Sequence, residues 1–160
     1  MAFFKIVKGK YHGDKSIRNV LRYILDEKKN PHSVHNVYGT SHEEIEKIVF
    51  RFIRVQELNR NTKGRRIIHF IVSFENNCSY TSIQFRQIGD LITNYFQGHQ
   101  IVYALHEKDN FDKIKQPHLH FAMNPVNYQT GKRIRFTKKD LRTFRKYLQD
   151  ILYEEISLLE

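Results

Sequence analysis

The sequence predicts an α+β fold in which helices pack on a mainly antiparallel central sheet. One observation indicates this class, and two more indicate a single domain. Stretches with strand and helix patterns are mixed along the chain without strict βαβ alternation. No linker, low-complexity tract or internal repeat interrupts the 160 residues, which include only seven Gly and three Pro. A chain of this length can bury roughly two-thirds of its unfolded surface in one core. We therefore expect a single domain over residues 1–160.

The first strand and the first helix are expected near the N-terminus. Residues 2–8 have the apolar content of a short strand. Ser16 can cap a helix that ends near Lys28, ahead of Pro31. The apolar residues of this helix keep helical spacing: Ile17, Val20, Leu21, Ile24 and Leu25.

A second helix, a buried strand and a third helix follow. Ser41 with Glu44 three residues later forms a capping box. The amphipathic stripe behind this box consists of Ile45, Ile48, Val49, Phe52 and Ile53. The apolar and β-branched residues 67–75 predict a buried strand, and residues 82–96 predict a helix that ends before Gly98.

Two strands and a last helix complete the expected fold. Residues 101–106 and 118–126 are the strands, joined by the polar residues 107–117. Thr137 with Asp140 opens the helix. Its core-facing residues are Leu141, Phe144, Leu148, Ile151 and Leu152. This helix runs almost to the end of the sequence, as expected if the chain is the N-terminal part of a longer protein.

The composition indicates a folded, basic protein. Apolar residues make up 40% of the chain, and 27 Lys and Arg against 17 Asp and Glu leave a net charge of +10. The single cysteine, Cys78, excludes an internal disulfide, and residues 1–8 are too short and too charged for a signal peptide. No window approaches the roughly 18 apolar residues of a membrane span. We expect a cytoplasmic protein whose partner is a polyanion, with nucleic acid ahead of an anionic membrane surface.

The positive charge is concentrated in three runs. Residues 5–29 form one, and Arg60, Lys63, Arg65 and Arg66 form another. The densest run contains Lys132, Arg133, Arg135, Lys138, Lys139, Arg142, Arg145 and Lys146. Any single run is equally well explained as a solvated face, but three runs in one small domain predict a shared track for nucleic acid. Six residues of the densest run are our predicted DNA-binding set: Lys132, Arg133, Arg135, Lys138, Lys139 and Arg142.

Histidines gather on one face of the last two predicted strands. A period of two places Ala104 and His106 on one face of the first strand. The same period places four residues on one face of the second strand: His118, His120, Ala122 and Asn124. If the strands are neighbours in register, three imidazoles converge above the small side chains of Ala104 and Ala122. The opposite faces are apolar and suited to pack on helices.

Three neutral imidazoles form a good ligand set for a divalent metal ion, and borderline ions suit them better than Mg²⁺ alone. Ordinary polar residues on an exposed sheet face are the alternative explanation. A lone histidine would favour that alternative. A His-x-His pair with a third histidine on the adjacent strand favours the metal site.

Three motifs resemble a known family. The order His106-Glu107-Lys108-Asp109-Asn110, then Pro117-His118-Leu119-His120-Phe121 and then Asn124, is similar to the third motif of the relaxase and mobilisation nucleases, which are HUH (His-hydrophobic-His) endonucleases. Residues 16–25, followed by Lys28 and Lys29, are similar to the family's early helix, which ends in Tyr-Ile followed by lysines. Residues 69–74 are similar to its hydrophobic strand ending in Ser-Phe. The resemblance covers about residues 15–130 and departs from the family in a longer gap between His106 and His118.

The resemblance implies a metal-dependent relaxase with an HUH fold. Such an enzyme nicks single-stranded DNA at a transfer origin through a covalent 5′-phosphotyrosine intermediate, for conjugation or plasmid mobilisation. The implied ligands are His106, His118 and His120, with Mg²⁺ or Mn²⁺ as the expected ion and Zn²⁺, Co²⁺ or Ni²⁺ as alternatives. Accessory DNA-binding proteins are further expected partners.

Tyr23 is the expected nucleophile among nine tyrosines. It lies roughly 130° around its helix from the centre of the apolar stripe, so it points away from that helix's own core. The family's early helix carries a tyrosine at this place. Tyr11 is a second candidate. Tyr147 would serve instead in a rolling-circle replication initiator, and a non-catalytic nucleic-acid-binding module would need no tyrosine.

Three residues are candidates to orient the metal-binding histidines without touching the ion themselves. Asp109, like Glu107, follows His106 closely and could orient a ligand imidazole through its other nitrogen. His69 shares its strand face with apolar residues, so we first expect a buried histidine that makes one hydrogen bond. A role in orienting a metal-binding histidine is the alternative. Asn124 follows the motif and completes this set.

Overall fold

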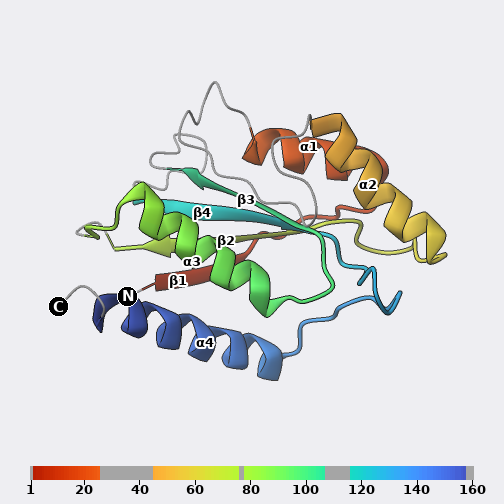
Figure 1. Ribbon diagram of the computed structural model, residues 1–160. Helices are drawn as coiled ribbons and strands as arrows, with labels where there is room; N and C mark the ends of the chain where they lie inside the picture. Colours follow the sequence, from red (N-terminus) through yellow and green to blue (C-terminus); the bar gives the residue numbers. More distant parts are fainter. Residues whose placement is uncertain (1, 26–44, 76–77, 107–115, 158–160) are drawn as a thin grey trace.

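The computed structural model describes residues 2–25, 45–75, 78–106 and 116–157 (Figure 1). Its four strands are β1 (Ala2–Ile6), β2 (Ile68–Phe74), β3 (Ile101–His106) and β4 (His118–Met123). Its four helices are α1 (Asp14–Ile24), α2 (Ile45–Leu58), α3 (Ser82–Tyr95) and α4 (Lys138–Ser157). The expected α+β class and the expected order of elements are confirmed.

The strands form one antiparallel sheet in the order β1-β2-β4-β3. β3 and β4 pair in the register that the histidine spacing required, with His106 opposite His118 and Ala104 opposite His120. β2 lies on the other side of β4, where His69 is opposite Ala122. The central position of β4 therefore brings side chains from three strands onto one face.

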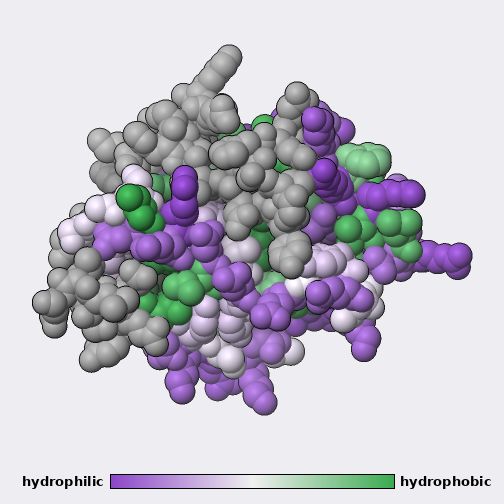
Figure 2. Space-filling model, viewed as in Figure 1, coloured by the Kyte–Doolittle hydropathy of each residue, from purple (hydrophilic) through white to green (hydrophobic). Residues whose placement is uncertain are grey.

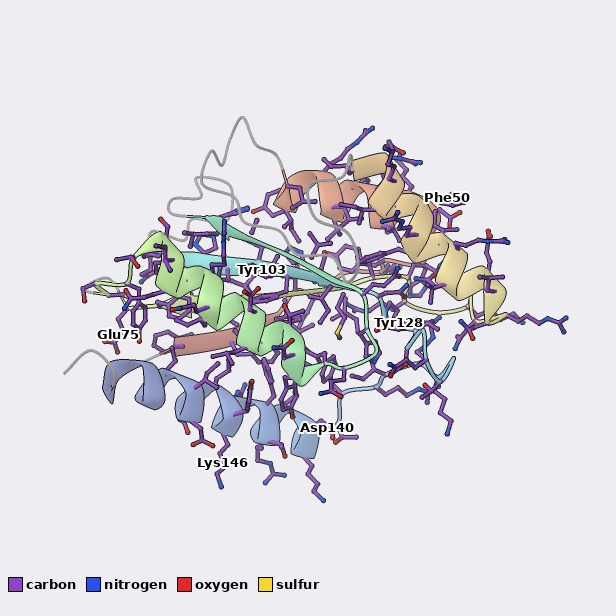
Figure 3. The ribbon with its side chains drawn as sticks, viewed as in Figure 1. Phe50, Glu75, Tyr103, Tyr128, Asp140 and Lys146 are labelled. Atoms are coloured by element: carbon purple, nitrogen blue, oxygen red, sulfur yellow. The ribbon has the colours of Figure 1, made fainter. Side chains whose placement is uncertain are left out.

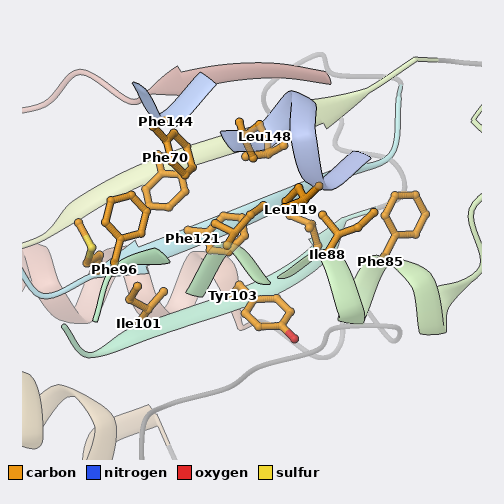
Figure 4. Packing of buried hydrophobic residues seen from close by; sticks show 14 of the residues in the cluster. Phe70, Phe85, Ile88, Phe96, Ile101, Tyr103, Leu119, Phe121, Phe144 and Leu148 are labelled. Carbon is orange, nitrogen blue, oxygen red and sulfur yellow. The ribbon is translucent and has the colours of Figure 1, made fainter. Parts of the chain in front are cut away.

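Helices α3 and α4 cover the apolar face of the sheet. The rings of Phe70 and Phe121 stack on neighbouring strands with centroids 4.6 Å apart. Phe144 of α4 packs edge-to-face on Phe4 of β1 at 4.9 Å and on Phe70 at 6.1 Å; Phe70, Phe121 and Phe144 are labelled in Figure 4. Aromatic pairs in such geometries add about 0.5–1.5 kcal/mol each beyond their burial. This layer is the main core of the domain.

Tyr103 fills the space between β3 and α3. It is fully buried, and its hydroxyl donates to the carboxylate of Asp90 at 2.6 Å (Figures 3 and 4). Burial and this carboxylate raise the pKa of Tyr103 above its ordinary value. The helix can approach the ring because residue 89 is glycine, where a Cβ would lie 2.5 Å from the ring.

Helices α1 and α2 cover the opposite face, the face of the histidines. Their apolar stripes pack together and on Val102, Ala104 and Ala122 of the sheet. Arg18 and Arg22 of α1 both pair with Glu46 of α2 at 3.1 Å. Helices therefore cover both faces of the sheet, because the stripes of α1 and α2 also need a surface to cover.

Several boundaries differ from those predicted. α1 begins at Asp14 with Gly13 as its cap, so Ser16 lies inside the first turn, where its backbone N–H donates to the Gly13 carbonyl. α1 ends at Ile24; Lys28 and the Ser41–Glu44 box lie outside the described residues.

The ends of other elements also differ slightly from the expected ones. β4 ends at Met123 rather than at residue 126, because Pro125 has no backbone N–H and the Asn124 side chain accepts from the Val126 N–H, which turns the chain. α3 ends at Tyr95, with Phe96 as its C-terminal cap. The Thr137–Asp140 start of α4 is confirmed by reciprocal hydrogen bonds. Within the described residues, no helix is both long and apolar enough to cross a membrane.

Candidate active site

Three histidines meet on the sheet face beneath α1. One ring nitrogen from each of His106, His118 and His120 lies within 4.8 Å of those of the other two. All three side chains are buried, at 1%, 0% and 0% exposure. The predicted convergence is confirmed, and the alternative of polar residues on an exposed sheet face is excluded.

Two of the three rings have a fixed proton position. His106 donates from Nε2 to the Ile24 carbonyl at 3.0 Å, and His118 donates from Nδ1 to the Gln116 carbonyl at 2.7 Å. A carbonyl oxygen only accepts, so the proton of each neutral ring sits on the bonded nitrogen. The lone pair then lies on Nδ1 of His106 and on Nε2 of His118.

The surroundings of His120 favour its neutral form. Burial lowers the pKa of His120 far below its ordinary value, and the neighbouring rings of His106, His69 and His118 lower it further. Metal ions bind the neutral form of histidine. Nitrogens that share one ion at about 2.1 Å lie about 3–4 Å apart, so nitrogens already within 4.8 Å of one another need only small shifts to share an ion. The donor set therefore fits a divalent metal ion.

Tyr23 lies against this cluster. Its ring centroid is 5.3 Å from that of His120 and 6.0 Å from those of His106 and His69. The last turn of α1 is held there by the bond from His106 to the carbonyl of Ile24, the residue after Tyr23. Although Tyr23 is off the apolar stripe of α1 in the sequence, its side chain is partly buried against the cluster that α1 and α2 form on the histidine face.

The two other candidate tyrosines lie elsewhere. Tyr147 packs on Tyr95 in the α3–α4 layer, and its hydroxyl donates to the Leu91 carbonyl at 2.8 Å. The sheet separates this position from the histidines. Tyr11 precedes the first turn of α1, at the opposite end of that helix from Tyr23, and its ring lies under the Arg65 guanidinium at 5.5 Å.

The three residues expected to orient the histidines lie in different places. His69 reaches the cluster: its Nε2 lies 2.9 Å from Nδ1 of His120. Asp109 and Glu107 lie outside the described residues. Asn124 is buried at the far end of β4, where its amide donates to the Phe52 carbonyl and to Gln100. The structure does not bring Asn124 to the histidines.

Sequence reasoning missed the buried polar network around Asn124. Gln56 of α2 donates to Asn124 and to the backbone carbonyl of Arg66, and the Arg66 guanidinium pairs with Asp14 at 2.6 Å. The network ties the first turn of α1 and the C-terminal half of α2 to the end of β4. Its only signal in the sequence is a polar residue at a stripe position of α2, Gln56.

The predicted DNA-binding residues fall into two groups. Arg133 bonds inward to the backbone carbonyls of Asn61 and Arg65, and burial lowers its pKa. The other five side chains are exposed: Lys132, Arg135, Lys138, Lys139 and Arg142. Three of these belong to α4, across the sheet from the histidines, where hydrophilic side chains line the lower edge of the molecule (Figure 2). Lys146, labelled in Figure 3, also points away from the sheet there.

An antiparallel sheet with this histidine cluster between helix layers defines the HUH class of nuclease domain. A sequence model described as "Relaxase: MobA/VirD2-like, nuclease domain" matches residues 23–155. The match covers most of the chain, which therefore belongs to this relaxase family. Comparison with curated protein sequences gave no match.

Proposed function

We propose that this chain is a metal-dependent relaxase that nicks single-stranded DNA at a transfer origin through a covalent 5′-phosphotyrosine intermediate on Tyr23. The observation that carries the proposal is the position of the Tyr23 ring against His120 and His106, at 5.3 and 6.0 Å between centroids. A phenolic nucleophile and a set of metal ligands then face the same phosphate.

The residues have distinct roles in this reaction. The Tyr23 oxygen attacks phosphorus and loses its proton, the bond from phosphorus to the 3′ oxygen breaks, and a free 3′ hydroxyl leaves. His106, His118 and His120 would hold the divalent ion, which when bound neutralises charge on the phosphate oxygens. The three imidazoles suit Mn²⁺, Co²⁺, Ni²⁺ or Zn²⁺ at least as well as Mg²⁺.

DNA binding and cellular role complete the proposal. The exposed cations of α4 and of residues 132–135 bind the phosphate backbone and retain the strand by charge. The process served is conjugative transfer or plasmid mobilisation in the cytoplasm, with accessory proteins that deliver the origin. The family supports this role, and the net charge of +10 is appropriate to it.

A covalent-adduct assay tests the proposal. The full chain is incubated with a pool of labelled single-stranded oligonucleotides and Mn²⁺, Mg²⁺, Co²⁺ or Zn²⁺, and adducts are resolved by denaturing electrophoresis. We expect an adduct with wild type and with Tyr147→Phe but none with Tyr23→Phe, which should still bind DNA. Peptide mapping should place the nucleotide on Tyr23.

The rival functions predict other results. A rolling-circle initiator that uses Tyr147 would lose the adduct in Tyr147→Phe and keep it in Tyr23→Phe. A non-catalytic binding module would bind the pool and form no adduct with any of the four ions. The position of Tyr147, across the sheet with its hydroxyl bound to Leu91, argues against the first rival.

A further inference from the structure

His120 differs from the other two cluster histidines in the partner of its outer nitrogen. His106 and His118 each donate to a backbone carbonyl, which can only accept. The partner of His120 Nδ1 is Nε2 of His69, at 2.9 Å, and a histidine nitrogen can either donate or accept. The proton position on His120 is therefore set by the proton position on His69.

Only one arrangement of these protons lets His120 bind a metal ion in the cluster. If His120 donates from Nδ1 to His69, its Nε2 has a lone pair. If His69 donates to His120 instead, the His120 proton sits on Nε2 and points into the cluster. The two arrangements carry the same number of protons, so a change between them releases none.

We infer that His69 is a positioning residue of this site, which accepts the hydrogen bond from His120 Nδ1 and so holds the His120 Nε2 lone pair toward the metal ion. This inference rests on the proposed function and adds to it the residue that selects the metal-binding tautomer. His69 itself then has its proton on Nδ1 and does not touch the ion.

The register of the sheet explains why His69 can reach this position. His69 on β2 is directly opposite Ala122 on β4, and His120 is diagonal to it, two residues along. The methyl group of Ala122 leaves room for the His69 ring to lean toward His120. The two ring centroids are 5.1 Å apart, and His69 is 5% exposed, so little water competes for the bond.

Metal affinity of designed variants tests this inference without any nicking. His69→Leu keeps an apolar side chain but cannot accept, and we expect 10–100-fold weaker binding of Co²⁺ or Mn²⁺ by calorimetry, the loss typical of such supporting partners. His69→Gln and His69→Glu offer an acceptor oxygen near the place of Nε2. Both should restore the affinity to within a few-fold of wild type.

His99 provides a matched control. It is also a buried histidine, and its Nδ1 bonds to the Asn124 carbonyl at 2.8 Å, at the other end of the sheet from the cluster. His99→Leu should reduce thermal stability about as much as His69→Leu and leave Co²⁺ affinity unchanged. Circular dichroism confirms that each variant is folded.

A second measurement needs no substitution. In nitrogen-15 spectra of wild type with bound Zn²⁺, which is diamagnetic, His69 should show an unprotonated Nε2 and a protonated Nδ1. A protonated Nε2 on His69 would overturn the inference, as would wild-type affinity in folded His69→Leu or a failure of both acceptor variants to rescue. If wild type binds no ion and forms no covalent adduct, the proposed function is wrong as well. If wild type binds an ion and forms the adduct, these results test only the role of His69.

Discussion

The Nε2 of His106 donates to the backbone carbonyl of Ile24, 82 residues earlier in the chain, at 3.0 Å. This bond satisfies one of the carbonyls left without a helical partner at the end of α1. It also fixes the turn that carries Tyr23 over the histidines. In the proposed site one imidazole would thus serve both halves, as a metal ligand through Nδ1 and as an anchor for the tyrosine-bearing turn through Nε2.

Replacing His106 should separate these two roles. His106→Gln can still donate from its amide to the Ile24 carbonyl, whereas His106→Ala cannot. We expect both variants to lose tight metal binding, and only His106→Ala to show faster hydrogen exchange in the last turn of α1. His118→Ala, which removes a bond to Gln116 rather than to α1, is the control and should leave that exchange unchanged.

His118→Ala and His120→Ala should abolish covalent-adduct formation and reduce Co²⁺ binding below detection. Both side chains lie on one face of β4, so each substitution leaves two of three ligands. The fold should persist, because the main core lies on the other face of the sheet. Adduct yield and calorimetry on the same samples check this, and unchanged nicking by either folded variant would contradict the metal site.

The exposed cations of α4 should govern the salt dependence of DNA binding. Replacing Lys138, Lys139 and Arg142 together by Gln should weaken single-stranded DNA binding and reduce the slope of log affinity against log salt by about 0.7 for each phosphate that is no longer neutralised. Arg133→Gln should instead lower thermal stability, because its guanidinium bonds to the backbone of residues 61 and 65. An equal slope of log affinity against log salt for wild type and the triple variant would exclude α4 from the DNA-binding surface.

Gly89→Ala should destabilise the domain although alanine is the better helix former. The new Cβ would lie 2.5 Å from the ring of Tyr103, which is fully buried and bonded to Asp90. Overpacking of about 1–3 kcal/mol outweighs the gain of about 1 kcal/mol in helix propensity. Thermal unfolding measures the effect. Asn94→Ala, at an exposed position of the same helix, should change stability by less than about 0.5 kcal/mol.

The interface between α1 and α2 should weaken in acid. Hydrogen bonds from Arg18, with the charge of Arg22, hold the pKa of Glu46 below its ordinary value. A depressed pKa in the folded state gives stability that is present above the unfolded value of about 4.3 and is lost as pH falls through the folded value.

The difference in unfolding free energy between wild type and Glu46→Gln should therefore shrink as the pH is lowered from 6 to 3. Denaturant titrations at each pH measure it. Glu57→Gln makes the same charge change near the other end of α2. A difference that stays constant across the range would exclude a role for the Glu46 pairs.

Those parts of the site that depend on the spacing of residues along one strand could be predicted from the sequence. The His-x-His pair and its partner on the adjacent strand follow from a period of two, and the structure needs only neighbouring strands to bring them together. The position of His69 could not be predicted in this way. Its hydrogen bond with His120 requires that β2 pair with β4 rather than with β3, which is a property of the whole sheet.

The remaining errors have similar physical causes. Ser16 has good capping chemistry, but the chain enters the helix earlier, at Gly13, where Asp14 can pair with Arg66. Arg133 belongs to a dense basic run, yet nearby carbonyls bind it inward. Charge in a sequence shows how many cations are present and not which of them tertiary contacts will use.

The wide sequence separation between Tyr23 and the histidines favours one order of assembly for the site. Strands β3 and β4 pair over a short span of chain, from Ile101 opposite Met123 to His106 opposite His118. The docking of α1 must close a loop about 80 residues long, which is entropically less favourable and slower. A partly folded chain can therefore assemble its imidazoles before the tyrosine arrives. If Tyr23 is the nucleophile, as we propose, cutting would then require that α1 has docked on the sheet.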